Sequence, residues 1–253
     1  MDSLSLFHPR IKKWFEEKVG KPTEIQEKAW PVIAGGSHVL MSAPTGTGKT
    51  LAAFLWAINQ LMTGEWEKGA AGTSVLYISP MRALNNDIRK NLILPIEQIG
   101  AGIGVMVRSG DTPPEERRRM LRHPPEILIT TPESLHILLT SKNSLLLFSN
   151  IKTVILDEIH AIAGDKRGTL LISSVERLAR ISGEFQRIVL SATIRPVNLI
   201  ADWAGSGRDM HVVEASRSKK FEIKIEFPRK TGANPEEDSN WPALIEEFKH
   251  LIK

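Results

Sequence analysis

Residues 43–50 of this 253-residue chain read APTGTGKT, and this stretch decides the fold. It follows an apolar run at 38–42 and precedes apolar residues at helical spacing, which predicts a strand, a tight loop and a helix in that order. In such a setting the backbone amides of the loop, its lysine and the start of the helix converge on negative charge. The stretch therefore predicts a phosphate-binding loop, although Ala43 replaces the first glycine of the general pattern.

This loop supplies the first candidate site residues. We expect the amine of Lys49 to contact the β- and γ-phosphates of ATP, and the hydroxyl of Thr50 to coordinate Mg²⁺. The candidate nucleotide-binding residues of the loop are Thr45, Gly46, Thr47, Gly48, Lys49 and Thr50.

An acidic element further along the chain complements the loop. Residues 154–160 read VILDEIH, an apolar strand that ends in two carboxylates. At the end of a neighbouring strand, Asp157 can hold Mg²⁺ and Glu158 can orient or deprotonate the attacking water. Such a pair alone is often only a solvated strand end, but together with the loop it indicates a hydrolytic site. The candidate catalytic residues are thus Lys49, Asp157 and Glu158, with Thr50 and Asp157 as metal ligands.

Short apolar runs alternate with helix-like segments on both sides of these motifs. This alternation predicts an α/β fold with a mainly parallel sheet covered by helices on both faces. Two helices, at 9–18 and 23–33, are expected before the first strand, and the lone tyrosine, Tyr77, is expected in the core. The expected strands are 38–42, 74–79, 103–107, 126–130, 153–157, 187–191 and 210–213.

The composition is that of an ordinary globular domain, with 42% hydrophobic and 25% charged residues. The absence of cysteine excludes disulfides, thiolate zinc sites, iron–sulfur clusters and cysteine nucleophiles. No window is apolar enough for a membrane span or a signal peptide, so a cytoplasmic protein with no membrane partner is expected. The net charge of +4 is compatible with a polyanionic partner, and equally with a mildly basic solvated surface.

Six short elements in a fixed order resemble the motifs of superfamily 2 helicases. Residues 22–26 (PTEIQ) resemble the Q motif, 79–84 (SPMRAL) motif Ia and 130–135 (TTPESL) motif Ib. The loop at 43–50 resembles motif I, and 157–160 (DEIH) and 191–193 (SAT) look like motifs II and III. The resemblance covers most of the chain and implies a RecA-like P-loop domain.

Within this superfamily the chain looks most like the Lhr family, the large helicase-related proteins. Residues 84–88 (LNNDI) and 108–113 (RSGDTP) carry this resemblance. Members of the family are bacterial and archaeal 3′-to-5′ DNA translocases that unwind duplexes or RNA:DNA hybrids, so the resemblance implies this polarity and these partners.

The resemblance also implies roles for single residues. Gln26 matches the glutamine that reads adenine, and its amide can both donate to and accept from the base edge. Phe7 is a candidate to cover the base or, alternatively, a core aromatic. His160, Ser191 and Thr193 match the residues that couple the nucleotide site to the nucleic-acid site.

Four residues near strand ends are candidates for contact with nucleic acid. Guanidinium and hydroxyl groups at these positions can grip backbone phosphates without reading the sequence. The candidates are Arg82, Arg108, Thr131 and Ser134. Thr131 and Ser134 can also cap the helix that follows them, and both roles can hold together. Residues 116–119 are expected to form a solvated helix face.

The motif order predicts three regions: N-terminal helices with the Q-like motif (1–36), a RecA-like ATP-binding helicase domain (37–214), and a linker (215–253) toward a second RecA-like domain of the same parent chain. Nothing after Thr193 resembles the arginine fingers of such a second domain, and 205–208 (GSGR) is interpreted as a loop. An arginine finger contributes a factor of about 10³ to 10⁵ in rate. These residues alone are therefore expected to bind nucleotide and hydrolyse it very slowly.

The favoured hypothesis is the first motor domain of an ATP-dependent helicase of Lhr type. It would use ATP and Mg²⁺ and act on single-stranded or partly duplex DNA, with RNA or an RNA:DNA hybrid as other candidates. A translocase or remodeller with the same core would move along duplex without separating strands. A nucleotide-switched binding module is a second class, against which the retained Glu158 counts. A small-molecule or nucleoside kinase shares the loop but not the other motifs.

Overall fold

The computed structural model of this chain describes residues 2–67, 72–80, 88–215 and 245. The chain divides into two units, Met1–Ser216 and Arg217–Lys253, and the described residues of the first unit form a compact domain. All described residues except Ile245 belong to the first unit. The predicted linker at 215–253 therefore lies almost entirely outside the described residues and stays a prediction.

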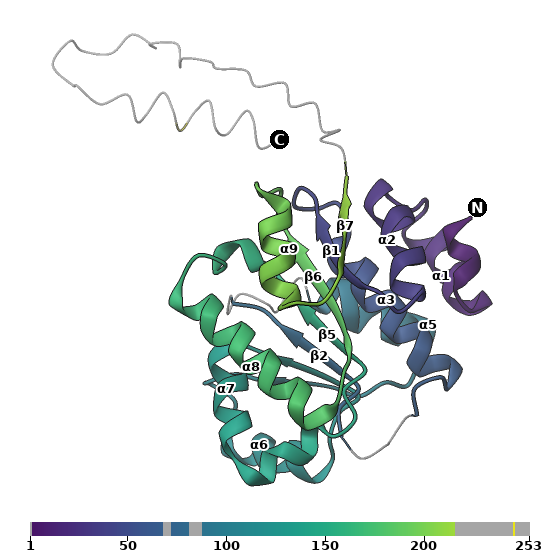
Figure 1. The fold of residues 1–253 in the computed structure, drawn as a ribbon. Coiled ribbons are helices and arrows are strands. Elements are labelled where there is room, and N and C mark those ends of the chain that lie inside the picture. The colour runs from purple at the N-terminus through teal and green to yellow at the C-terminus, as the bar shows by residue number, and fades with distance from the viewer. Residues whose placement is uncertain (1, 68–71, 81–87, 216–244, 246–253) are drawn as a thin grey trace, which may run out of the picture. The chain divides into compact units, whose positions relative to one another are not determined.

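A sheet of seven parallel strands, in the order β3-β4-β2-β5-β6-β1-β7, forms the centre of the first unit (Figure 1). This confirms the predicted α/β fold, and the observed strand ends lie within two residues of the expected ones. The strands are β1 His38–Ser42, β2 Val75–Ile78, β3 Val105–Arg108, β4 Ile127–Thr130, β5 Thr153–Leu156, β6 Gln186–Ser191 and β7 Met210–Glu214.

Helices cover both faces of this sheet, because parallel neighbours must be joined by crossovers (Figure 1). On one face an apolar cluster joins the sheet to α1, α2, α3 and α5. On the other face a second cluster joins it to α6, α7, α8 and α9. The helices are α1 Pro9–Lys18, α2 Glu24–Ala34, α3 Lys49–Thr63, α5 Leu94–Ile99, α6 Pro114–Arg122, α7 Pro132–Thr140, α8 Lys166–Ser182 and α9 Val197–Gly205, with the shorter η1 Ser3–Leu6, η2 Arg89–Ile93, η3 Lys142–Phe148 and η4 Ile159–Ala161.

Two features of these helices bear on the sequence predictions. On α6 only Met120 is buried, which confirms the solvated face expected at 116–119. Among the described residues, no helix is long and apolar enough to cross a bilayer.

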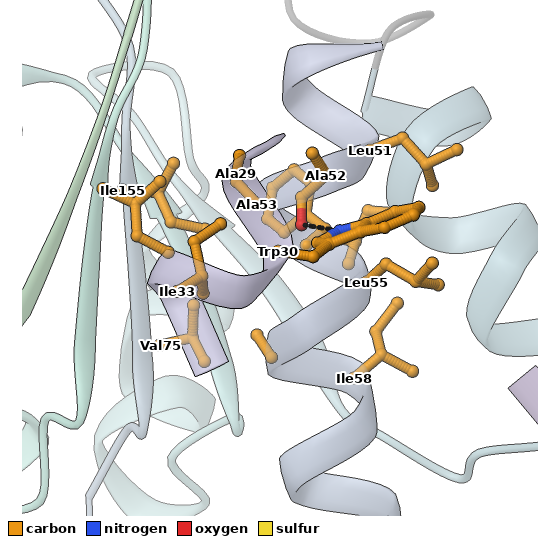
Figure 2. Close-up of a cluster of buried hydrophobic side chains, with 14 of the residues drawn as sticks. Ala29, Trp30, Ile33, Leu51, Ala52, Ala53, Leu55, Ile58, Val75 and Ile155 are labelled. Carbon is orange, nitrogen blue, oxygen red and sulfur yellow. Dashed lines mark hydrogen bonds between the residues drawn. The ribbon is translucent and has the colours of Figure 1, made fainter. Parts of the chain in front are cut away.

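Trp30 lies at the centre of the first cluster. Its indole is fully buried between α2 and α3, beside Leu51 and Leu55 (Figure 2). The indole Nε1 donates to the carbonyl of Ala52 at 3.2 Å, which satisfies its one polar atom. Phe7 packs edge-on against Trp30, with ring centroids 4.9 Å apart, and is itself buried. This burial confirms the core alternative for Phe7.

A buried cation ties α8 and α9 to β6 on the second face. The side chain of Arg187 is fully buried, and its Nη2 lies 2.7 Å from Glu176 Oε1. Its Nη1 donates to the carbonyl of Ala204 in α9 at 3.2 Å. Arg208, in the predicted loop after α9, lies 3.0 Å from the same oxygen of Glu176. Burial by itself would raise the pKa of Glu176, but the two guanidinium groups hold this pKa below its ordinary value of 4.5.

Protonation of Glu176 at low pH should therefore lower the free energy of unfolding of this unit. A carboxyl whose pKa is lowered by folding stabilises the fold above its unfolded pKa, and that stability is lost as the pH falls through the folded-state pKa. We expect the urea midpoint to decline less steeply in Glu176→Gln than in wild type, over a range of about pH 6 to about pH 3. Glu65→Gln, at an exposed site after α3, should keep the wild-type decline. Equal slopes for wild type and Glu176→Gln would contradict this role.

Candidate functional site

The predicted site residues meet at one edge of the sheet. β2, β5, β6 and β1 are neighbours, and all four run in the same direction. Their carboxyl ends therefore lie side by side, in the place where open parallel sheets bind their ligands. The 43–48 loop follows β1, the two acids follow β5, and residues 191–193 follow from the end of β6.

Two glycines shape the loop between β1 and α3. Gly46 and Gly48 have φ values of +78° and +87°, a left-handed conformation that other residues rarely adopt. Gly48 also packs against the side chain of Gln26, because a Cβ here would lie only 2.5 Å from Gln26 Nε2. Thr45 and Gly46 are exposed at the tip of the loop. The loop leads directly into α3, so free backbone amides and the positive end of this helix border it.

Lys49, the first residue of α3, folds back into the loop. Its side chain is mostly buried, and its Nζ donates to the carbonyls of Ala43 at 2.6 Å and Pro44 at 3.0 Å. Burial lowers the pKa of Lys49, while the nearby carboxylates of Asp157 and Glu158 oppose this shift. Neutral carbonyls thus hold the amine, and phosphate oxygens would be stronger partners for it.

Asp157 gathers three donors around its carboxylate. It is 6% exposed at the end of β5, and its Oδ1 accepts the backbone N–H of Glu158 at 2.7 Å. Its Oδ2 accepts the hydroxyl of Tyr77 and lies 3.4 Å from the hydroxyl of Thr50. Burial raises the pKa of Asp157, although the hydrogen bonds from Tyr77 and from the Glu158 amide oppose this. The two predicted metal ligands, Thr50 and Asp157, are thus brought together although far apart in sequence.

Tyr77 is a site residue that sequence reasoning missed. It is buried in β2, as expected of a core residue, but its hydroxyl contacts the carboxylate of Asp157. The strand register explains the contact, because Tyr77 pairs with Ile155 and Asp157 lies two residues beyond that partner. Side chains two residues apart in a strand point to the same face. The signal in the sequence was the phenol hydroxyl of Tyr77, a polar group in a strand whose other side chains are apolar.

Glu158 and His160 lie beside the end of β6. Glu158 has a φ of +49°, a left-handed conformation that is uncommon outside glycine and concentrates at functional sites. Its Oε2 lies 3.3 Å from Nδ1 of His160, and the same nitrogen accepts the N–H of Ala192 at 3.2 Å. One nitrogen cannot donate to Glu158 while it accepts from Ala192, so Nδ1 can make only one of these two hydrogen bonds at a time.

The other two predicted coupling residues, Ser191 and Thr193, flank Ala192, whose N–H donates to this histidine. Ser191 ends β6, and its buried hydroxyl has no hydrogen-bond partner among the described residues. Thr193, two residues further on, is half-buried. The structure therefore brings motifs II and III into contact through His160 and Ala192, and the coupling roles of His160, Ser191 and Thr193 stay predictions.

Gln26 and Thr23 connect α2 to the phosphate-binding loop. Gln26 is buried; its Oε1 accepts the N–H of Thr23 at 3.0 Å, and its Nε2 donates to the carbonyl of Gly48 at 3.2 Å. The hydroxyl of Thr23 donates to the carbonyl of Thr47 at 2.8 Å. The Q-like motif thus fixes two carbonyls of the loop, a role of Thr23 that sequence reasoning missed. Recognition of adenine by Gln26 stays a prediction.

Two of the candidates for nucleic-acid contact carry a guanidinium group. Arg82 lies outside the described residues. Arg108 ends β3 and shares the inward face with Met106, so its side chain is buried and donates to the carbonyl of Ser109. It borders a cavity of about 210 Å³ between α6, α7 and η3. Burial, together with the neighbouring Arg117, lowers the pKa of Arg108.

Thr131 and Ser134 lie at the start of α7. Thr131 is the N-cap residue, and its hydroxyl oxygen accepts the N–H of Ser134 at 3.3 Å. The same hydroxyl lies 3.2 Å from the hydroxyl of Ser134, and both side chains are largely buried. The capping interpretation is confirmed for Thr131, while contact of either residue with nucleic acid stays a prediction.

Arg167 joins the segments that resemble motifs Ia and Ib. From the first turn of α8 its Nε donates to Glu133 at 2.6 Å, and its Nη2 donates to the carbonyl of Pro80 at 2.9 Å. No local pattern in the sequence indicated this contact, because Pro80, Glu133 and Arg167 belong to three separate segments.

The site offers few protein ligands for a metal. The described residues contain no group of three or more histidine, cysteine or acidic side chains that could enclose an ion. The convergent oxygens of Thr50 and Asp157 instead resemble an open site for a hard cation, which takes most of its ligands from phosphate and water.

A parallel sheet with a phosphate-binding loop after β1, and paired acids at the end of the nearby β5, defines a RecA-like nucleotide-binding domain of the helicase class. A family model described as DEAD/DEAH box helicase matches residues 23–200. The chain belongs to the DEAD/DEAH box helicase family.

Similar proteins confirm the resemblance to Lhr helicases. The chain is 41% identical to "Lhr helicase/ probable uracil glycosylase" of Mycolicibacterium smegmatis, over 100% of the chain and 17% of that protein. It is 46% identical to "ATP-dependent helicase Lhr-Core" of Methanocaldococcus jannaschii, over 86% of the chain and 27% of that protein. The solved structure of Mycobacterium smegmatis helicase Lhr bound to ssDNA and AMP-PNP matches with a TM-score of 0.86 and 40% identity, over 100% of the chain and 33% of that one. The chain thus spans a third or less of the length of these relatives.

Proposed function

We propose that this chain is the first motor domain of an ATP-dependent nucleic-acid helicase of Lhr type, which moves 3′ to 5′ along DNA. One observation carries the proposal: Lys49, Thr50 and the Asp157-Glu158 pair meet at the carboxyl edge of the sheet, beside a loop that can enclose phosphates. A lysine, a hydroxyl and two carboxylates in this arrangement are the parts that nucleotide hydrolysis requires.

The metal ligands fit Mg²⁺. Thr50 Oγ1 and Asp157 Oδ2 lie 3.4 Å apart, and both are hard oxygen ligands. The hydroxyl of Tyr77 and the N–H of Glu158 donate to the same carboxylate and hold it in place. When bound with ATP, Mg²⁺ neutralises charge on the phosphate oxygens. Thr50 and Asp157 are the residues that would hold it.

The remaining residues act on the nucleotide and on water. Lys49 would exchange the carbonyls of Ala43 and Pro44 for β- and γ-phosphate oxygens, because a cation binds an anion more strongly than a neutral carbonyl. Glu158, half-exposed next to Asp157, would orient or deprotonate the attacking water. Gln26 would contact adenine after leaving the carbonyl of Gly48.

The partners of the domain are inferred from its relatives. The solved relative is described as bound to ssDNA and AMP-PNP, which supports single-stranded or partly duplex DNA as the partner, with RNA or an RNA:DNA hybrid as other candidates. Because the chain spans a third or less of its relatives, we infer that a second RecA-like domain of the same parent protein completes the site. That domain would supply the arginine fingers and the other wall of the nucleic-acid groove.

Removal of the lysine amine should abolish tight nucleotide binding. We expect Lys49→Ala to weaken Mg²⁺-ATP binding about 100-fold, because phosphate would lose its charged partner in a largely buried site. Titration of the 253-residue chain with a fluorescent ATP analogue measures this. Lys152→Ala is the matched control, since Lys152 is exposed at the opposite end of β5. Unchanged affinity in Lys49→Ala would contradict the proposed site.

Strand displacement by the parent protein distinguishes the helicase from its alternatives. A helicase should release the shorter strand of a tailed duplex only with hydrolysable ATP, and more rapidly from a 3′ tail than from a 5′ tail. Hydrolysis without displacement would favour a translocase or remodeller. No hydrolysis stimulated by nucleic acid, with nucleotide binding intact, would favour a nucleotide-switched binding module.

A further inference from the structure

We propose that Tyr77 is a positioning residue, which orients the carboxylate of Asp157 so that one oxygen faces the hydroxyl of Thr50 and can take Mg²⁺ there. The inference rests on the proposed nucleotide-hydrolysing function and extends it to a residue outside the loop and the acidic pair. Its basis is a buried contact between β2 and the end of β5.

Hydrogen bonds to both oxygens restrict the orientation of the Asp157 carboxylate. The N–H of Glu158 holds Oδ1 at 2.7 Å, and the hydroxyl of Tyr77 donates to Oδ2. Rotation about the terminal bond of an aspartate is otherwise soft and broadly distributed. Donors on both oxygens remove this freedom and leave the side of Oδ2 that faces Thr50, 3.4 Å away, for a further partner.

Tyr77 is itself held rigidly. It is 2% exposed in the middle of the sheet, where β2 pairs with β4 on one side and with β5 on the other. Its ring stacks on Phe54 of α3, with centroids 4.9 Å apart and planes inclined by 29°. Since α3 also carries Thr50, the ring that positions Asp157 is packed against the same helix that supplies the second metal ligand.

The hydroxyl of Tyr77 would not touch the metal itself; it donates a hydrogen bond to the carboxylate of Asp157, the proposed metal ligand, and so orients it. In metal sites such partners fix the direction of the ligand lone pairs, and their loss weakens metal binding about 10-fold to 100-fold. The phenol hydroxyl is the only polar atom of this side chain, and Tyr77→Phe deletes it while the stacked ring stays in place. The substitution therefore separates the orienting role from the packing role.

The test is the Mg²⁺ dependence of nucleotide binding by the 253-residue chain. A fluorescent ATP analogue is titrated in EDTA and then at increasing Mg²⁺, for wild type, Tyr77→Phe and Phe54→Leu. We expect Tyr77→Phe to keep the wild-type affinity in EDTA and to require about 10-fold more Mg²⁺ for half of the metal effect. Phe54→Leu removes the stacked ring but keeps the hydroxyl, so it should lower the urea midpoint with a much smaller change in the Mg²⁺ requirement.

The possible outcomes distinguish this inference from the proposed function. A Mg²⁺ requirement in Tyr77→Phe that equals the wild-type value overturns the positioning role and leaves the nucleotide site intact. An equal increase in Phe54→Leu and Tyr77→Phe also overturns it, because packing alone then explains the effect. Wild-type binding that does not respond to Mg²⁺ would overturn the metal assignment to Thr50 and Asp157, and the inference with it.

Discussion

The 253-residue chain should hydrolyse Mg²⁺-ATP about 10³ to 10⁵ times more slowly than a longer chain that includes the second RecA-like domain. The physical reason is the charge that spreads over the transferring phosphoryl group and needs an arginine beside it. The one arginine in the stretch 205–208 cannot serve, because Arg208 is bound to Glu176 and Glu184 in the described part of the chain. Steady-state phosphate release from both chains, each with and without single-stranded DNA, measures the difference.

Stimulation by DNA should appear in the longer chain alone. The nucleic-acid groove of a two-domain motor has one wall on each domain, so a single domain binds the strand weakly and cannot close on ATP. Nucleotide binding by the shorter chain is the control, because the loop and the acids are complete in the 253 residues. Rapid hydrolysis by the shorter chain would show that Lys49, Asp157 and Glu158 suffice, and would refute the divided site.

Glu158→Gln in the longer chain should lower the rate of hydrolysis by about 10² to 10⁴ and leave ATP affinity close to wild type. An amide cannot accept the proton of the attacking water, whereas Lys49 and Thr50 still bind the phosphates. Glutamine has nearly the same shape, so the left-handed backbone at this position, φ +49°, is not further strained. Single-turnover hydrolysis and equilibrium binding of an ATP analogue separate the two effects.

A matched control isolates the position of this carboxylate. Glu115→Gln removes a carboxylate from an exposed site on α6 and should leave the hydrolysis rate unchanged. A Glu158→Gln variant with the wild-type rate would exclude Glu158 as the group that activates water. Loss of ATP affinity to the same degree as the loss of rate would instead show that Glu158 acts in binding.

Much of the site was predictable because its parts are contiguous in the chain. The loop at 43–50 carries its glycines, lysine and hydroxyl in one segment, and the structure gives Gly46 and Gly48 the left-handed conformation that such a loop requires. The acids at 157 and 158 were found for the same reason, since a strand that ends in two carboxylates is a local pattern. Parallel strands then place such segments at one edge of the sheet.

The burial of Arg108 was not predictable in the same way. Alternation of side chains along a strand shows that neighbours face opposite sides, but it does not show which side is covered. Met106 packs in the apolar cluster beneath α6 and α7. Arg108, two residues further along β3, points to the same face of the sheet and is buried there. The guanidinium group expected at the surface is therefore largely buried.

By itself the sequence determined the class of fold, the order of strands and helices along the chain, and the loop and acidic pair that the structure brings together at one edge of the sheet. These properties follow from local periodicity, from glycine conformations and from short motifs, all of which act within a few residues. Only the tertiary structure decided the strand order β2-β5-β6-β1, the contact of Tyr77 with Asp157 and the bridge from Arg167 to Glu133. Such contacts depend on strand register and on packing between distant segments, and no local pattern of side chains encodes them.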